Sequence, residues 1–192
     1  MTFIRSACLS LLVLTAAAIP TSAFALGLGY GAKLGFGSGQ STNDDASDTS
    51  LTAGLLVLNL DLMAVAIEGN LGFHRMTVDD ADDTYNDELS VVAIVKTGIP
   101  IIPAVLSLDF GAGLDQRILL GSTLNGTELD GASGSRTLIP ISVQASGSVL
   151  LARLYGEIRY NYEIASSFEV DGTEVESDDK LHELLFLVGA TF

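Results

Sequence analysis

The sequence lacks most of the residues on which cross-links and catalytic sites depend. It has one cysteine, Cys8, near the amino terminus, so the rest of the chain can form neither a disulfide framework nor a thiolate metal site. Tryptophan is absent, histidine occurs twice, and neither an HExxH nor a GxSxG pattern is present. Lys and Arg number 9 against 24 Asp and Glu, a net charge of −15 that disfavours nucleic acid as a partner. The sequence therefore predicts no enzyme.

Residues 1–25 have the pattern of a secretory signal peptide. Arg5 supplies the positive start, Leu9 to Ile19 is an apolar run, and Ala23-Phe24-Ala25 is a small-x-small cleavage site. The run is shorter than the roughly 20 residues that a membrane-spanning helix needs, and no longer apolar run follows it. We expect a cleaved signal followed by one domain over 26–192, with an uncleaved anchor as the alternative.

Charge and hydrophobicity are segregated along the remaining chain. Hydrophobic residues make up 48% of the sequence, yet 17 of the 24 acidic residues fall within four Gly/Ser/Asn-rich stretches. These long stretches alternate with three short breaks near 59–61, 99–103 and 146–148. The acidic stretches are 38–50, 76–88, 119–136 and 166–180, and the strand-sized segments between all the breaks are 26–37, 51–60, 62–75, 88–98, 103–117, 136–147, 149–165 and 181–192.

Most of the eight segments alternate between an apolar and a polar or glycine face. In 149–165, Ile158 and Tyr160 alternate with Glu157 and Arg159, and in 26–37 large apolar residues alternate with glycine. A soluble barrel of the lipocalin kind would bury the apolar face and leave these mid-strand charges in water. A membrane barrel, with apolar residues outward and charge in a narrow lumen, explains both the charges and the glycines. We therefore predict an all-β, eight-stranded antiparallel up-and-down transmembrane β-barrel.

A few apolar residues do not fit this alternation, because they fall on the expected polar face. They indicate that part of the lumen is apolar or that a bulge shifts the register. These residues are Leu56, Leu58, Val92, Ile94, Leu185 and Leu187.

Parity along the segments predicts which charged residues face the lumen. Because eight strands leave an interior just wide enough for side chains, these charges should pair and plug it. A gated ion path through the same network is the alternative. The predicted lumen network is Lys33, Glu68, Lys96, Asp109, Asp115, Arg117, Arg153, Glu157, Arg159, Glu163 and Glu183.

The acidic stretches are predicted to form a solvated rim of loops. Clustered carboxylates also suit hard cations, so a divalent ion such as Ca²⁺ or Mg²⁺ is the alternative, and no other cofactor is expected. The candidate ligands are Asp79, Asp80, Asp82 and Asp83, which lack the spacing and glycine of an EF-hand loop.

The two histidines are predicted to be structural. His74 is expected on the inward face and His182 on the outward face near the outer rim. An outward histidine beside a rim serine would suit a lipid hydrolase, and Ser166, Ser167 and Ser177 are the available serines. No nucleophile motif accompanies them.

Taken over 26–192, the chain resembles the small eight-stranded, porin-like outer-membrane barrels of the OmpA/OmpX/OmpW kind. The terminal stretch Leu187 to Phe192 is similar to the signal that such proteins offer to the barrel-assembly machinery, with Phe192 as its last residue and Ala190 where an aromatic is common. The resemblance implies an integral outer-membrane location and contact with lipid. We expect a monomer.

Two functions are compatible with this pattern. The first is a structural or surface-interaction role carried by the acidic loops. The alternative is a small channel or carrier for small solutes.

Overall fold

The computed structural model of the chain describes residues 27–42, 49–62, 65–78, 83–102, 105–149, 151–170, 173–175 and 179–192. The predicted signal peptide lies outside these ranges, as do Asp79, Asp80 and Asp82 of the predicted cation site.

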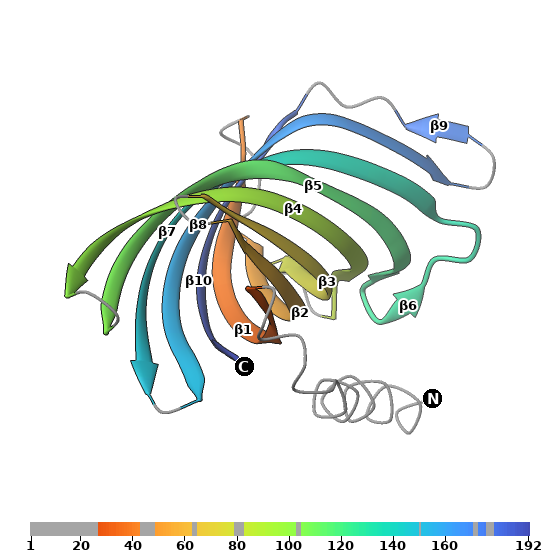
Figure 1. Cartoon of the computed structure of the whole chain (residues 1–192). Helices are drawn as coiled ribbons and strands as arrows, with labels where there is room; N and C mark the ends of the chain where they lie inside the picture. Colours follow the sequence, from red (N-terminus) through yellow and green to blue (C-terminus); the bar gives the residue numbers. More distant parts are fainter. Residues whose placement is uncertain are drawn as a thin grey trace.

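Eight long antiparallel strands form a single sheet that closes into a barrel (Figure 1). Consecutive long strands pair with each other, and the last strand pairs with both β8 and the first strand, which completes the ring. Two short strands, β6 and β9, extend the hairpins at one end. The strands are β1 (Leu28–Ser41), β2 (Thr49–Leu62), β3 (Val65–Val78), β4 (Tyr85–Ile102), β5 (Leu106–Leu124), β6 (Thr127–Glu128), β7 (Ser133–Val149), β8 (Ala152–Val170), β9 (Thr173–Val175) and β10 (Leu181–Thr191).

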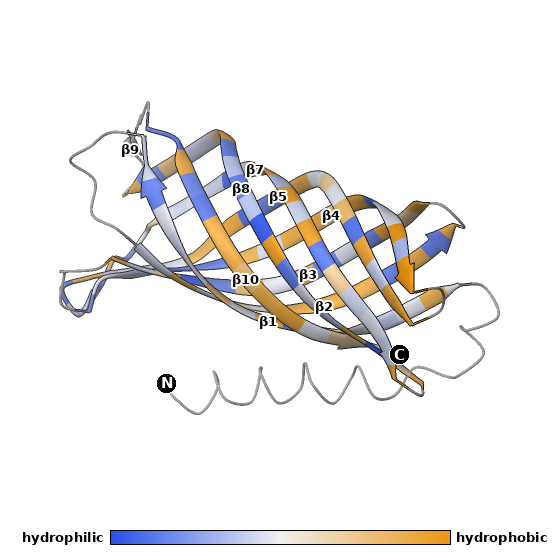
Figure 2. Ribbon diagram, turned by 90° about the vertical axis from the view of Figure 1, so that its left-hand side faces the viewer, coloured by the Kyte–Doolittle hydropathy of each residue, from blue (hydrophilic) through white to orange (hydrophobic). Residues whose placement is uncertain are grey.

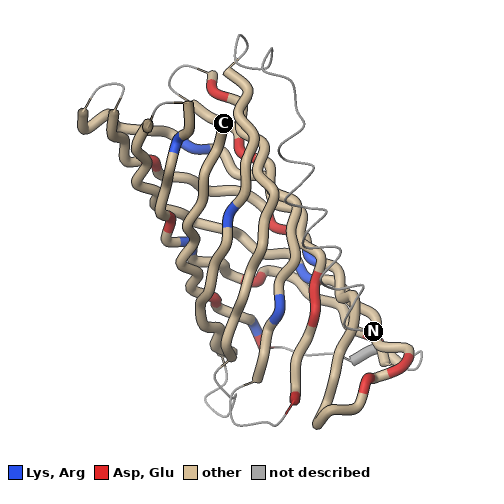
Figure 3. Tube along the Cα trace, turned by 90° about the horizontal axis from the view of Figure 1, so that it is seen from below, with Lys and Arg blue, Asp and Glu red and all other residues tan. Residues whose placement is uncertain are grey.

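The barrel turns its apolar side chains outward and its charges inward. On β8, Ile158 is 51% exposed whereas its neighbour Glu157 is 3% exposed. The same alternation follows the other long strands, and the charges lie along the strands as well as at their ends (Figures 2 and 3). Within the described residues no helix is long and apolar enough to cross a bilayer. The predicted fold class is confirmed, and the soluble, lipocalin-like orientation of the faces is wrong.

Several strands are longer than the alternation predicted, at the end that carries the long loops (the long-loop end). β5 continues to Leu124 and turns into β6 through Asn125 and Gly126, which have positive φ values of 48° and 76°. An Asn-Gly pair with this geometry is typical of a tight hairpin turn. The acidic stretch 76–88 is predicted to be a loop up to the start of the segment 88–98, yet β3 continues to Val78 and β4 already begins at Tyr85. Hydrogen bonding between strands continues beyond the apolar part of the wall, because the ladder depends on the backbone and not on side-chain hydropathy.

The prediction for β2 was wrong in its choice of face. Leu58 is 50% exposed on the outside, and Leu55, 2% exposed, faces the lumen. Both faces of this strand are apolar, so alternation alone cannot distinguish them. Pairing does, since Leu55 lies directly opposite Lys33, and opposite residues of adjacent strands share a face. The prediction that Val92, Ile94, Leu185 and Leu187 face inward agrees with their exposures of 0–1%.

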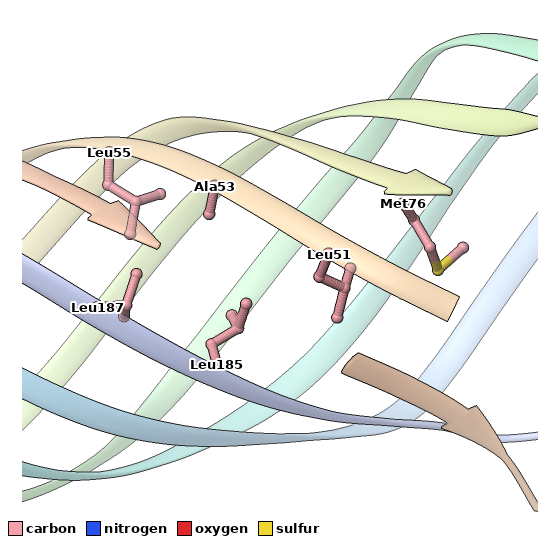
Figure 4. Close-up of a cluster of buried hydrophobic side chains, with 6 residues drawn as sticks. All are labelled: Leu51, Ala53, Leu55, Met76, Leu185 and Leu187. Atoms are coloured by element: carbon pink, nitrogen blue, oxygen red, sulfur yellow. The ribbon is translucent and has the colours of Figure 1, made fainter. Parts of the chain in front are cut away.

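An apolar cluster therefore occupies one side of the lumen, around the bare inner face of β1. Apart from Lys33, that face carries glycine at alternate positions from Gly29 to Gly37. A Cβ atom added to Gly35 would lie 2.4 Å from the Leu187 side chain, so the missing side chains make room for those of the neighbouring strands. Leucines of β2 and β10 converge there (Figure 4). The cluster is Leu51, Ala53, Leu55, Met76, Leu185 and Leu187.

Candidate functional site: the barrel lumen

A compact group of charges crosses the middle of the lumen, and we call it the middle layer: Lys33, Glu68, Lys96, Glu157 and Arg159. The Lys33 ammonium donates to both carboxylates, Glu68 and Glu157. Lys96 donates to Glu68 at 2.7 Å and to Gln144 at 2.8 Å, and Arg159 pairs with Glu157 at 2.8 Å. The five come from four strands that are not all adjacent, so their side chains span the interior. Side chains of the middle layer therefore contact one another across the interior.

A second group lies closer to the long-loop end, the outer layer, and it centres on Arg117. Its guanidinium forms a two-point pair with Glu183, at 2.7 and 2.6 Å, and bonds Asp115 at 2.9 Å. Glu88 links the two arginines, since it lies 3.4 Å from Arg117 and 2.9 Å from Arg136. All of these side chains are at least nine-tenths buried. The outer layer consists of Glu88, Asp115, Arg117, Arg136, Glu163 and Glu183.

Such pairing is what makes buried charge tolerable. An ion removed from water costs several kcal/mol, and only a close counter-ion with further hydrogen bonds offsets that cost. Asn161 supplies one such bond to Glu183 at 2.8 Å, and Ser90 supplies another to Asp115 at 2.7 Å. The lumen is consequently a polar core in which each charge depends on the others.

The opposite end of the barrel, which carries the short connections (the short-turn end), is open. A polar cavity of about 410 Å³ enters the lumen there and extends inward as far as Glu68 and Lys96. Arg153 and Asp109 line its wall and form an ion pair of 3.3 Å, and the Tyr155 hydroxyl is buried beside it without a protein partner. No outer-layer side chain lines this cavity, so the middle layer is its floor.

The structure places the eleven predicted lumen charges inside the barrel or at this mouth. Nine are buried within the two layers, and Asp109 and Arg153 form the pair at the mouth. Two members of the outer layer, Glu88 and Arg136, were not predicted. Glu88 shares parity with Ser90 and Lys96 on the inner face of β4, so alternation along this strand could have identified it although it also ends an acidic stretch.

His74 is one of several buried polar groups that have no hydrogen-bond partner among the described residues. Both ring nitrogens of His74 lack a hydrogen bond, although the side chain is 1% exposed. His74 lies directly opposite Glu88 on the neighbouring strand, so it borders the outer layer. Unsatisfied groups of this kind cost about 1–3 kcal/mol unless water reaches them.

The other predicted site residues lie outside the lumen or outside the described residues. His182 faces outward near the long-loop end, bonds the Tyr160 hydroxyl at 2.5 Å and packs against Tyr162. Of the predicted cation ligands only Asp83 is described, with a φ of 48°, and no group of three or more acidic or histidine side chains in the described ranges could hold a metal. Phe192 is 48% exposed, and its backbone exchanges hydrogen bonds of 2.8 and 3.1 Å with Tyr30.

These features define a small eight-stranded antiparallel barrel with an apolar exterior and a charged interior. Comparison with a solved structure, that of a Neisserial surface protein, supports the same fold. Neisserial surface protein A (NspA) superposes with a TM-score of 0.61 at 15% identity, over 86% of this chain and 97% of that one. Ail, the attachment invasion locus protein of Yersinia pestis, also matches, with a TM-score of 0.45 at 14% identity over 85% and 98% of the two chains. No family model and no curated protein matches the sequence.

Proposed function

We propose that the chain is an integral outer-membrane β-barrel with a closed lumen, which acts at the surface through its loops and does not conduct solutes. The observation that carries the proposal is the reversal of faces: side chains such as Phe36 and Val188 are 66% and 64% exposed, while eleven layer charges are buried. An exposed apolar wall of this size is compatible with lipid and not with water. The ring of eight long antiparallel strands also leaves none of them as an edge strand, as a bilayer requires.

Closure of the lumen rests on the two layers in series. A solute entering the cavity at the short-turn end reaches the middle layer, and beyond it lies the outer layer. Displacing Lys33 would leave Glu68 and Glu157 short of a counter-ion, and displacing Arg117 would do the same to Glu183. Opening either layer thus costs the pairing energy of several buried ions at once.

A second candidate function, a small channel or carrier, is favoured by the cavity itself. It extends from the short-turn end as far as Glu68 and Lys96, so a solute could enter part of the lumen from that side. In such a channel the layer charges would have to rearrange in order to admit a solute.

Two measurements test the proposal. Carbonate extraction of cell envelopes should leave the protein with the membrane, and its release would contradict the integral location. Co-flotation with vesicles first verifies that the purified protein inserts into lipid. The same protein in planar bilayers should then give no discrete conductance steps. Ion-selective steps of reproducible size would favour the channel instead.

The proposal includes a non-enzymatic role and a monomer. His182 is bonded to Tyr160 on the outer wall, where no described serine is its hydrogen-bond partner, and His74 is enclosed in the lumen. We also propose that the barrel-assembly machinery inserts the chain through its Phe192 end and that the acidic chain excludes nucleic acid. Binding of a Ca²⁺ or Mg²⁺ ion by the loops is a further proposal.

A further inference from the structure

The short-turn end of the barrel carries an unusual group of exposed apolar side chains, which we call the apolar collar. Connections at a wet end of a barrel are ordinarily polar. Here the described residues that border the β2–β3, β4–β5 and β7–β8 connections are aliphatic and exposed, and Leu151 is 81% exposed. The collar consists of Leu62, Val65, Ile99, Ile101, Ile102, Val105, Leu106, Val149 and Leu151, each at least 36% exposed.

The collar continues the outer wall without a charged interruption. Near this end the charged residues of the described chain are Asp61, Asp109 and Arg153, and all three line the lumen cavity. On β4 the outward positions Val95, Ile99 and Ile101 are 56–59% exposed, so the wall and the collar form one apolar surface.

The height of this surface exceeds a usual barrel wall. A strand tilted by about 40° rises roughly 2.5 Å per residue along the barrel axis. The outward column of β5 from Leu106 to Leu120 is then about 35 Å tall, against about 25 Å for the apolar band of membrane barrels. Gln116 is its one polar member, and its side-chain oxygen accepts a 2.7 Å bond from Thr137.

The excess lies at the short-turn end. The upper limit of the band is marked on the outer wall by the ion pair of Arg75 with Asp87, at 2.6 Å, and Asp87 lies opposite Gly121, next to Leu120. Apolar surface counted downward from there passes the usual limit before it reaches Leu106. The β4–β5 and β7–β8 hairpins project past the carboxyl terminus at this end (Figure 1).

We propose that the apolar collar is embedded in lipid acyl chains, so that the barrel lies deeper in the bilayer on the side of the β4–β5 and β7–β8 hairpins. This inference rests on the proposed membrane location. A lipid occupant is favoured over a protein partner because the collar is continuous with the lipid-facing wall and carries no charge of its own. The cavity mouth, with Asp61 and Arg153, would then open at the level of the lipid headgroups.

The chain is well suited to a test because it has no tryptophan, and no cysteine outside the predicted signal peptide. The single-tryptophan variants Leu151→Trp and Ile101→Trp are each placed in nanodiscs that contain brominated phosphatidylcholine and no other membrane protein. Val188→Trp, on the wall, is the lipid control, and Glu128→Trp, on exposed β6, is the water control. We expect the collar variants to be quenched within about twofold of Val188→Trp, and Glu128→Trp to be unquenched.

The corresponding cysteine variants guard against a tryptophan that seeks the interface by itself. In the same nanodiscs a charged maleimide should modify Leu151→Cys and Ile101→Cys at least about tenfold more slowly than Glu128→Cys, since a charged reagent is excluded from acyl chains. Rates equal to that of Glu128→Cys, with Val188→Trp still quenched, would overturn the collar proposal and leave the collar free for a protein. An unquenched Val188→Trp would instead overturn the membrane location itself.

Discussion

Arg117 offers the sharpest measure of how far the barrel depends on buried charge. Its guanidinium holds Glu183 by two bonds of 2.7 and 2.6 Å and also contacts Asp115 and Glu88. Replacement by methionine keeps much of the volume but leaves four outer-layer carboxylates with Arg136 as the remaining guanidinium of the layer. Breaking a buried pair in this way costs about 3–5 kcal/mol, so Arg117→Met should lower the free energy of unfolding by that amount.

Arg75→Met is a matched control. Arg75 also forms a two-point pair, with Asp87 at 2.6 and 2.8 Å, but the Arg75 side chain is 34% exposed. Its loss should cost no more than about 1 kcal/mol. Urea unfolding in lipid vesicles, followed by circular dichroism, measures both variants. Adding Glu183→Leu to Arg117→Met should recover most of the loss, because it removes the stranded carboxylate. Equal losses for the two arginine variants, or a double variant weaker than the single, would refute the reasoning.

Three further substitutions test the packing of the wall and the lumen by the same unfolding assay. Gly31→Ala would place a Cβ atom 1.8 Å from the Ala190 carbonyl oxygen and should destabilise the barrel by at least about 2 kcal/mol. Gly156→Ala, whose added Cβ would have nothing within 4 Å, should leave the stability unchanged. Similar losses for the two variants would contradict the close approach of β1 and β10. Leu185→Ala, at a fully buried lumen position, should cost about 2–5 kcal/mol, and no loss would mean that the apolar cluster does not stabilise the barrel. Ile158→Arg on the outer wall should cost about 2–4 kcal/mol in a bilayer, and a silent change would argue against lipid contact there.

Alternation predicts the orientation of a strand well when its two faces differ in chemistry. β8 is the clear case, since Ile158 and Tyr160 alternate with Glu157 and Arg159, and the structure exposes the first two and buries the others. β2 is the counter-example, because the run Leu55 to Leu58 is apolar on both faces. Its orientation depends on its neighbour Lys33, which is tertiary information.

The lumen residues can be predicted more easily than their partners. Parity along single strands is local, and it would have added Glu88 and Arg136 to the predicted set. The pairing of one strand's charges with another's depends on the stagger around the whole ring, which no single segment encodes. The extent of β5 beyond the wall is a different case, since the Asn125-Gly126 pair is a local turn signal that can be read from the sequence.

Because the inner face of β1 otherwise carries glycine, Lys33 is the residue of that face that can select the strand register when the ring closes. β1 meets its two neighbours, β2 and β10, yet the carboxylates that receive Lys33 come from β3 and β8, one strand further away on each side. If the register of β1 were shifted by one residue, the Lys33 ammonium would point toward hydrocarbon. A shift of two residues would move the ammonium away from both carboxylates. A single cation on a strand whose inner face otherwise carries glycine thereby stabilises one register of the first and last strands relative to the alternatives.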